Sequence, residues 1–282
     1  MTAPRRVLSI CADDFGLTPA ISRGIVELAQ RGRLTAVSCL VSGDQWPASA
    51  ALLAELPAWV ERGLHFNLTD GEPISAPLRR RAPRTLALPG LIAAAHLGWL
   101  PLPAIACEWQ AQWQRFVDTT GAAPRFVDGH QHVHHLPGVR DIVLAAVAAS
   151  PGAVAVRNTG SVIGPGDAAK RWLIERTGGV ALQRQLRQAG IEHNRVLLGV
   201  YGFRDPDYRR RMQGWLAAVP AQGGLLFCHP AAVEIGAARS VDPIGPARLR
   251  EAAYLGSPAF EDDCGEAGVT LGPAWQQRSS AG

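Results

Sequence analysis

Short β-type runs alternate with helical stretches along almost the whole chain, and this alternation limits the fold more than any other feature of the sequence. Each run combines apolar and β-branched residues over a few positions. The runs lie at residues 7–12, 35–41, 64–68, 125–127, 154–157, 196–200 and 224–228. Strands that alternate with helices form parallel sheets. The pattern therefore predicts an α/β protein with about seven parallel strands, either doubly wound or closed as a barrel.

The first helical stretch carries the clearest boundary signals. Thr18 suits an N-terminal cap, Pro19 suits the first helical position, and Gly32 suits the C-terminal stop. Between them, Ile21 and Ile25 begin an apolar stripe. Further helices are predicted near residues 47–56, 103–119, 137–149, 168–189, 205–218 and 245–254.

The chain of 282 residues is 47% hydrophobic, which is enough for one large core. Because no repeat, low-complexity block or long linker divides it, we expect a single domain over residues 1–282. That domain carries an apolar excursion at about 86–106, since residues 88–106 contain no Asp, Glu, Lys or Arg. Three prolines and His96 interrupt this stretch. It is therefore predicted to be a buried or surface-capping segment and not a transmembrane segment.

Charge and cysteine content narrow the function classes. The net charge of +4 is small and the arginines are scattered, so nucleic acid is not an expected partner. The five cysteines are odd in number, widely spaced and without a CxxC pair. The apolar run near the N-terminus stops at Asp13, too soon for a signal peptide. Reduced thiols in a cytoplasmic protein are the expectation.

Polar residues with chemical potential cluster at the carboxyl ends of the predicted strands. They are Asp13, Asp14, His65, His130, Arg157 and His229. In a (β/α) barrel these ends share one face, and active sites are built on that face. The sequence therefore predicts that six side chains far apart in the chain converge in one pocket.

Two carboxylates and at least two imidazoles suit a divalent metal ion. Adjacent strand residues point to opposite sides, so Asp13 and Asp14 need a local turn to share a site, and Gly16 permits one. One aspartate would bind the metal while the other handles the proton of a water molecule. In "DGHQHVHH" (128–135), one histidine would coordinate the metal and the others would support it or lie at the surface.

The residues also resemble a known family. "CADDFG" (11–16), "RGLHFNLTDGEP" (62–73), "FVDGHQHVH" (126–134) and "LLFCHP" (225–230) occur in the order and spacing of the YdjC-like carbohydrate deacetylases, the group of ChbG-like and HpnK-like proteins. The resemblance runs from about Val7 to His229. It implies a distorted (β/α) TIM-like barrel and metal-dependent removal of an acetyl group from an N-acetylated amino sugar.

By the same resemblance each motif residue has an implied role. Asp14, His65 and His130 would bind the metal, which would be Mg²⁺ or Zn²⁺, with Mn²⁺ and Co²⁺ as alternatives. Asp13 would be the general base, His229 the general acid, and Arg157 the residue that holds the base. The resemblance is looser around Arg157, and Cys11 stands where the family often has Asn.

Simpler interpretations compete with these roles. An Asp after a strand is often a helix cap, a single His is often a core residue, and Arg157 could be a structural ion-pair partner. A metal-dependent phosphoesterase or amidohydrolase, or a carbohydrate-binding protein without turnover, remains an alternative function.

Fewer features of the sequence bear on the identity of the substrate. The indole rings of Trp99, Trp109 and Trp113 would stack on a sugar or pack against outer helices. The apolar excursion suggests that the sugar carries a lipid or another bulky group, as an alternative to a chitooligosaccharide. Pairing of barrels into a homodimer is a general expectation with no specific signal in the sequence.

Overall fold

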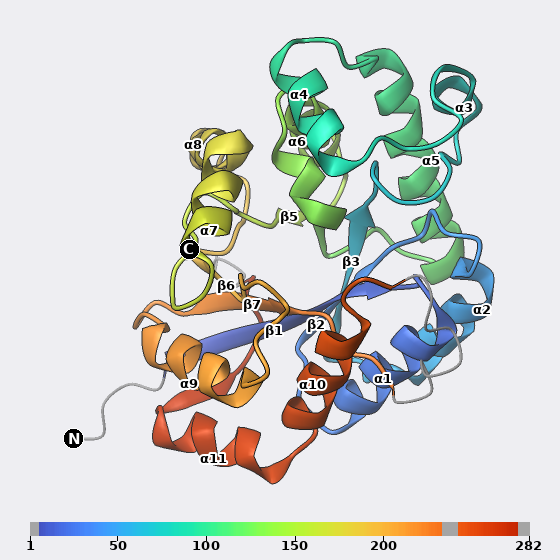
Figure 1. The fold of residues 1–282 in the computed structure, drawn as a ribbon. Coiled ribbons are helices and arrows are strands. Elements are labelled where there is room, and N and C mark those ends of the chain that lie inside the picture. Colours follow the sequence, from blue (N-terminus) through green and yellow to red (C-terminus); the bar gives the residue numbers. More distant parts are fainter. Residues whose placement is uncertain (1–5, 233–241, 276–282) are drawn as a thin grey trace, which may run out of the picture.

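The computed structural model describes residues 6–232 and 242–275, and one parallel sheet runs through them (Figure 1). Seven strands form its main path in the order β5, β4, β3, β2, β1, β7, β6, and β8 pairs with the start of β1. The strands are β1 (Arg6–Phe15), β2 (Ala36–Cys39), β3 (Glu61–Phe66), β4 (Phe126–Gly129), β5 (Ala155–Val156), β6 (Leu197–Leu198), β7 (Gly224–Cys228) and β8 (Val269–Leu271). The predicted α/β class with about seven parallel strands is confirmed.

The chain that follows β5 brings the two edges of the sheet together. Val162 forms a parallel bridge with Leu197 of β6, and the N–H of Ile163 donates to the carbonyl of Leu197. The sheet is therefore curled into a half-barrel. This curl selects the distorted barrel over the open, doubly wound alternative.

The strand β1 lies at the centre of the sheet, because it pairs with β2, β7 and β8. Its residues 8–15 are all buried. A strand covered on both faces needs apolar residues, and Leu8 and Ile10 meet that need. Asp13 and Asp14 are polar but are buried as well, so the strand ends with two carboxylates in the interior.

Helix α1 begins and ends where the sequence signals place it. Pro19 is the first residue of α1, and the hydroxyl of Thr18 accepts a hydrogen bond from the N–H of Ile21 at 3.2 Å. Gly32 has a φ of +71° just after the helix, in the left-handed region that favours glycine. The helices are α1 (Pro19–Gln30), α2 (Trp46–Ala50), α3 (Ala76–Arg81), α4 (Leu88–His96), α5 (Leu102–Thr120), α6 (Val139–Ala148), α7 (Ala168–Ile174), α8 (Val180–Ala189), α9 (Tyr208–Ala218), α10 (Gly245–Leu255) and α11 (Pro258–Glu266).

The single helix predicted over 168–189 is wrong in its middle. A π-helical turn, Glu175–Gly179, separates α7 from α8, and Gly178 has a φ of +157°. A β-carbon at Gly178 would lie 2.0 Å from the carbonyl oxygen of His135. The helix is interrupted because another segment of backbone packs directly against it at this glycine.

The excursion between β3 and β4 is larger than predicted, since it includes α3, α4 and the start of α5. Its base is fixed by buried polar contacts. Asn67 exchanges two hydrogen bonds with Gln112 of α5, at 3.0 and 2.8 Å. The Glu108 carboxylate accepts the N–H groups of Ile74 and Ser75. These contacts satisfy backbone groups that would otherwise be buried without partners.

The apolar stretch 88–106 is divided between α4 and the first turn of α5, and only part of it is buried. Leu91 and Ala95 of α4 face the interior, whereas Leu97 and Trp99 are exposed. Within residues 6–232 and 242–275, no helix is long and apolar enough to cross a bilayer.

Candidate metal centre

Three predicted ligands meet at the carboxyl ends of β1, β3 and β4. Asp14 Oδ1 lies 3.1 Å from His130 Nδ1 and 3.4 Å from His65 Nε2. One ligand atom from each residue lies within 4.8 Å of the other two. The side chain of His65 is 2% exposed and that of His130 is 15% exposed, so solvent reaches the group from the His130 side. One carboxylate and two imidazoles form a donor set that suits a divalent cation.

The backbone at the end of β1 explains how two adjacent aspartates serve different partners. Asp14 itself has a φ of +68°, and the pairing of β1 with β2 shifts register between Ala12 and Phe15. The sequence predicts a turn at Gly16, which also has a positive φ of +101°. A left-handed residue breaks the alternation of a strand. Asp14 can therefore contact the histidines while Asp13 contacts Arg157.

His65 is held from behind by a carboxylate that was not singled out from the sequence. Asp128 of β4 is the register partner of His65, and its Oδ1 lies 2.6 Å from His65 Nδ1. The hydroxyl of Ser38 donates to the same oxygen at 2.5 Å. Burial opposes the charge on His65, but Asp128 and its hydrogen bond raise the pKa of the ring to about 10. The contact with Asp128 keeps a proton on His65 Nδ1. A cation would displace the proton from Nε2 and bind the lone pair of that nitrogen.

Asp13 belongs to a second buried cluster, which a guanidinium fills. Arg157 Nη1 and Nη2 donate to the two carboxylate oxygens of Asp13, each at 2.6 Å. Arg157 Nη2 also lies 2.5 Å from Asp128 Oδ2 and 3.2 Å from Cys11 Sγ. Cys11, Asp13 and Asp128 have the spacing of a metal site, but the positive charge is already supplied by Arg157.

Burial and ion pairing act in opposite directions on the pKa values of the carboxyl groups in this second cluster. Burial raises the pKa of Asp13, and the charge of Arg157 acts in the opposite direction. Burial also disfavours a charge on Asp128, yet Arg157 and His65 lower the pKa of that carboxyl to about 2. Both oxygens of Asp13 accept N–H groups, which describes an ionised carboxylate. The structure places Arg157 against Asp13, and the role of this pair in catalysis stays a prediction.

Arg248 of α10 contacts the other oxygen of Asp14. Its Nη2 donates to Asp14 Oδ2 at 2.7 Å, and its Nε donates to Asp242 at 2.6 Å. Burial disfavours the Asp14 charge, but Arg248 and His130 hold the pKa of that carboxyl well below its usual range. Because Oδ2 is engaged by Arg248, Asp14 presents Oδ1 alone to the two histidines.

His229 follows β7 at the same end of the sheet. Its backbone N–H donates to Glu251 Oε2 at 2.5 Å, and Glu251 Oε1 accepts the hydroxyl of Tyr201 at 2.5 Å. The rings of Phe203 and Phe227 meet the imidazole edge-on, with centroids 5.2 and 5.5 Å away. Burial lowers the pKa of His229 well below its usual range. His229 Nδ1 is buried and has no hydrogen-bond partner among the described residues, and the lowered pKa favours the neutral form of the ring.

The remaining histidines of the 128–135 segment are interior residues. His134 Nε2 lies 2.9 Å from the carbonyl oxygen of Arg157. His135 bridges two hydroxyls, with Nδ1 at 2.9 Å from Thr159 and Nε2 at 3.0 Å from Thr177. Burial lowers the pKa of His134 to about 4, and it also lowers the pKa values of His132 and His135. These three rings support the segment, and only His130 faces Asp14.

The three tryptophans considered for substrate stacking have different positions. Trp109 is buried, with its ring 5.1 Å from that of Phe66 and 5.8 Å from that of Trp113. The packing alternative therefore holds for Trp109. Trp99 is 73% exposed and does not pack into the core.

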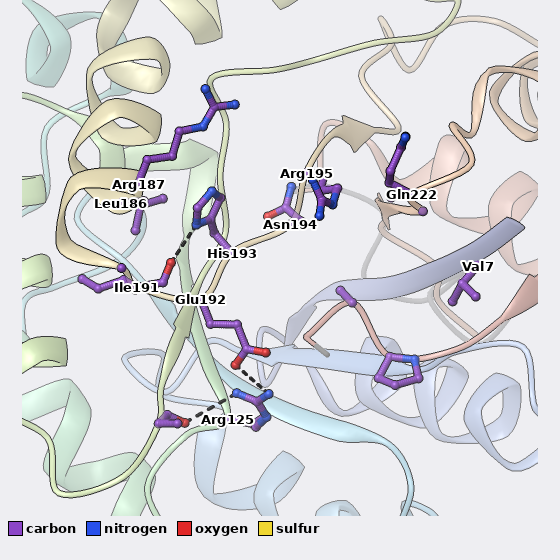
Figure 2. Close-up of a pocket in the computed structure, with 16 residues that line it drawn as sticks. Val7, Arg125, Leu186, Arg187, Ile191, Glu192, His193, Asn194, Arg195 and Gln222 are labelled. Carbon is purple, nitrogen blue, oxygen red and sulfur yellow. Dashed lines mark hydrogen bonds and ion pairs between the residues drawn. The ribbon is translucent and has the colours of Figure 1, made fainter. Parts of the chain in front are cut away.

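A large cavity lies at the opposite ends of the strands, away from the aspartates and histidines described above. It has a volume of about 1160 Å³ and is lined by residues near the starts of β1, β4, β6 and β7. Figure 2 shows Arg125 paired with Glu192 on one side of it and Arg187 extending on another. None of the six predicted site residues lines this cavity.

The structure thus brings Asp14, His65 and His130 into one group and places Asp13 with Arg157 beside it. Sequence reasoning missed Asp128, Arg248 and Glu251. Asp128 stands in the motif that contains His130, two residues before it, so a signal was available. Arg248 lies 234 residues from Asp14 in the chain, and no motif marked it.

Known proteins are similar to this chain, some in sequence and one in fold. A carbohydrate deacetylase of Mus musculus is 40% identical over 156 residues, covering 53% of this chain and 49% of that protein. A chitooligosaccharide deacetylase of Salmonella typhimurium is 40% identical over 148 residues, covering 49% of this chain and 54% of its own. The matched region thus spans about half the length of these curated relatives.

A solved structure from Enterococcus faecalis, assigned a provisional role in cellobiose-phosphate cleavage, has the same fold. It superposes with a TM-score of 0.73 at 21% identity, covering 96% of this chain and 98% of that one. The family model described as YdjC-like protein matches residues 7–266. The chain therefore belongs to the YdjC-like protein family.

Proposed function

We propose that this protein is a metal-dependent hydrolase that removes the acetyl group from an N-acetylated amino sugar, either a chitooligosaccharide or a lipid-linked sugar. The observation that carries the proposal is the group of Asp14, His65 and His130, with the buried Asp13–Arg157 pair beside it. The names of the curated relatives support the reaction class.

The donor set fits a divalent cation. Asp14 Oδ1, His65 Nε2 and His130 Nδ1 would hold the metal, and Asp128 would fix the orientation of His65. A cation bound there supplies Lewis acidity, which lowers the pKa of a water molecule and polarises the acetyl carbonyl. Mg²⁺, Zn²⁺, Mn²⁺ and Co²⁺ all accept such mixed oxygen and nitrogen donors.

Asp13 would accept the proton of the attacking water. Each carboxylate oxygen has two lone pairs, so Asp13 retains acceptor capacity after both oxygens are bound by Arg157. Arg157 would keep the carboxylate of Asp13 in position while that carboxylate gains and loses a proton. Burial raises the pKa of Asp13, which makes it a better proton acceptor than a solvated carboxylate.

His229 would deliver a proton to the departing amine. The amine of the sugar departs only when its nitrogen is protonated, because the deprotonated amine anion is too basic to be a leaving group. The proton that Asp13 takes from the attacking water would be passed on to the neutral ring of His229, whose unpartnered Nδ1 can accept it before the ring gives a proton to the amine. Its lowered pKa makes the protonated ring a strong acid once formed.

The direct test is acetate release from N-acetylglucosamine oligomers by purified protein that has been stripped of metal and then resupplied with each of the four cations. We expect release only after resupply, and we expect Asp13→Asn and His130→Ala to abolish it. Asp141→Asn and His193→Ala are matched controls, since both residues lie outside the site. Both should retain activity.

The alternatives give different results in the same assay. Phosphate release from phosphorylated sugars without acetate release would favour a phosphoesterase. Binding of the oligomers without any product would favour a carbohydrate-binding protein. Failure of His130→Ala to change metal content would refute the metal centre itself.

A further inference from the structure

Large apolar side chains are exposed on the 86–106 excursion and on α7, outside the metal centre. In the 86–106 excursion, Trp99 is 73% exposed, Leu97 is 56% exposed and Leu102 is 38% exposed. On α7, Trp172 and Leu173 are exposed as well. We call these five side chains the Trp99 face.

The two parts of the Trp99 face are joined by hydrogen bonds. His96 Nε2 lies 3.1 Å from the carbonyl oxygen of Thr177, and the hydroxyl of Thr177 donates to the carbonyl of Leu173 at 2.8 Å. Leu97 follows His96 directly in the chain. The helical segment that carries Trp172 and Leu173 is therefore in contact with the excursion just before Leu97.

Basic residues outnumber acidic ones in the excursion that carries Trp99. Residues 73–107 contain no Asp or Glu, and their only formally charged side chains are Arg79, Arg80, Arg81 and Arg84. All four arginines are exposed, and none forms an ion pair with any residue of 6–232 or 242–275. Figure 1 shows α3, which carries three of them, and α4 at the same end of the molecule. Gly71, which lies between the exposed Asp70 and Glu72, accepts a hydrogen bond from the hydroxyl of Thr85 beside Arg84 at 3.0 Å. Four arginines against two acidic residues leave this end of the excursion with an excess of positive charge.

The face also lies near the metal centre. The hydroxyl of Thr177 contacts His135 Nε2 at 3.0 Å, and His135 ends the short segment that begins at His130. The side chain of Leu102 lies where a β-carbon on Gly138 would meet it, at 2.7 Å. The Trp99 face is therefore attached to the carboxyl-end rim of the sheet.

We propose that the Trp99 face docks on the surface of an anionic lipid bilayer. Exposed Trp and Leu side chains enter the boundary between headgroups and acyl chains, and arginines beside them attract anionic headgroups. A second copy of this chain is a poorer occupant, because a two-fold contact through this face would bring the arginine groups of both copies together. The docking does not depend on the proposed activity.

The test is co-sedimentation of the full chain with phosphatidylcholine vesicles and with vesicles that contain one third phosphatidylglycerol. We expect binding to the anionic vesicles and weak binding to the neutral ones. Trp99→Ala should weaken that binding about tenfold. Each of Arg79→Gln, Arg80→Gln and Arg81→Gln should weaken it about fivefold, and 1 M salt should weaken it further.

Matched controls come from the opposite ends of the strands. Trp59 is 64% exposed in the turn before β3, and Arg195 is exposed before β6. Trp59→Ala and Arg195→Gln should bind anionic vesicles like the original chain. Thermal unfolding of every variant shows whether it is folded, and acetate release from a soluble oligomer reports the activity separately from docking.

Three results would overturn the proposal. One is the absence of binding to anionic vesicles by the folded original chain. Another is an equal loss of binding in Trp59→Ala and Trp99→Ala. The third is a concentration-dependent dimer that Trp99→Ala dissociates, together with no vesicle binding, which would assign the face to a second copy.

Discussion

Asp128 and His65 face each other across neighbouring strands as register partners, with Oδ1 and Nδ1 2.6 Å apart. The contact joins the two buried clusters of the site, since Asp128 also pairs with Arg157 and Arg157 pairs with Asp13. A change at Asp128 therefore reaches both the proposed metal ligands and the proposed base.

Asp128→Asn should weaken metal binding by about 10-fold to 100-fold and reduce acetate release, because the amide no longer fixes His65 as a charged partner would. Competition with a chelator measures the affinity. Asp141→Asn, which changes an exposed carboxylate, is the matched control. Unchanged metal affinity in folded Asp128→Asn would show that the contact only stabilises the fold.

Asp14→Asn and Asp14→Val should separate the metal role of Asp14 from its backbone role. Both variants should lose metal binding. Asn tolerates the positive φ of this position, whereas a β-branched residue does not, so we expect the Val variant to be less stable by a further ~1–3 kcal/mol. Urea unfolding measures the difference. Equal stability of the two variants would mean that the left-handed backbone is not retained.

Glu251→Gln should change how stability depends on pH. Burial raises the pKa of Glu251 from 4.5 to about 7, so the folded chain holds a proton that the unfolded chain releases above pH 4.5. The free energy of unfolding of the original chain therefore falls as the pH rises from 4.5 to about 7. Gln cannot release a proton, so the free energy of unfolding of the variant does not fall for this reason. Between pH 5 and pH 8 the variant should gain up to about 3 kcal/mol relative to the original chain.

Urea unfolding at the two pH values measures this gain. Glu27→Gln, at an exposed position of α1, serves as the control and should give no such difference. Parallel stability curves for Glu251→Gln and the original chain would contradict the expected proton uptake.

Trp109→Ala should reduce stability and leave substrate affinity unchanged, because the ring packs against Phe66 inside the protein. The expected loss is about 3–5 kcal/mol. Unfolding and the KM for an oligomer should be measured on the same preparation. A raised KM with little loss of stability would restore the sugar-stacking interpretation.

The sequence predicts the strands and the residues at their ends because both are local signals. A run such as 224–228 is apolar throughout, and His229 follows it immediately. The convergence of Asp14, His65 and His130 then follows from parallel strand geometry. The pairing of Asp13 with Arg157 is a contact in the structure, and the catalytic role implied for it by family resemblance stays a prediction.

The missed features depend on contacts that no local pattern encodes. Arg248 and Glu251 lie on α10, whose sequence looks like that of any partly buried helix, and their partners lie on β1 and after β7. The break between α7 and α8 depends on the approach of the His135 carbonyl to Gly178. Such contacts are set by how distant segments pack.

The contacts of Asn67 with Gln112, and of Glu108 with the backbone at Ile74 and Ser75, fix the excursion at its base, next to β3. The strands that carry the proposed ligands lie on one side of these contacts, and Trp99 and the four exposed arginines of the excursion lie on the other. The reaction centre and the segment that selects its surface or substrate are therefore separate parts of this fold. A different excursion grafted between Asn67 and Gln112 would direct the same reaction centre to another surface or substrate.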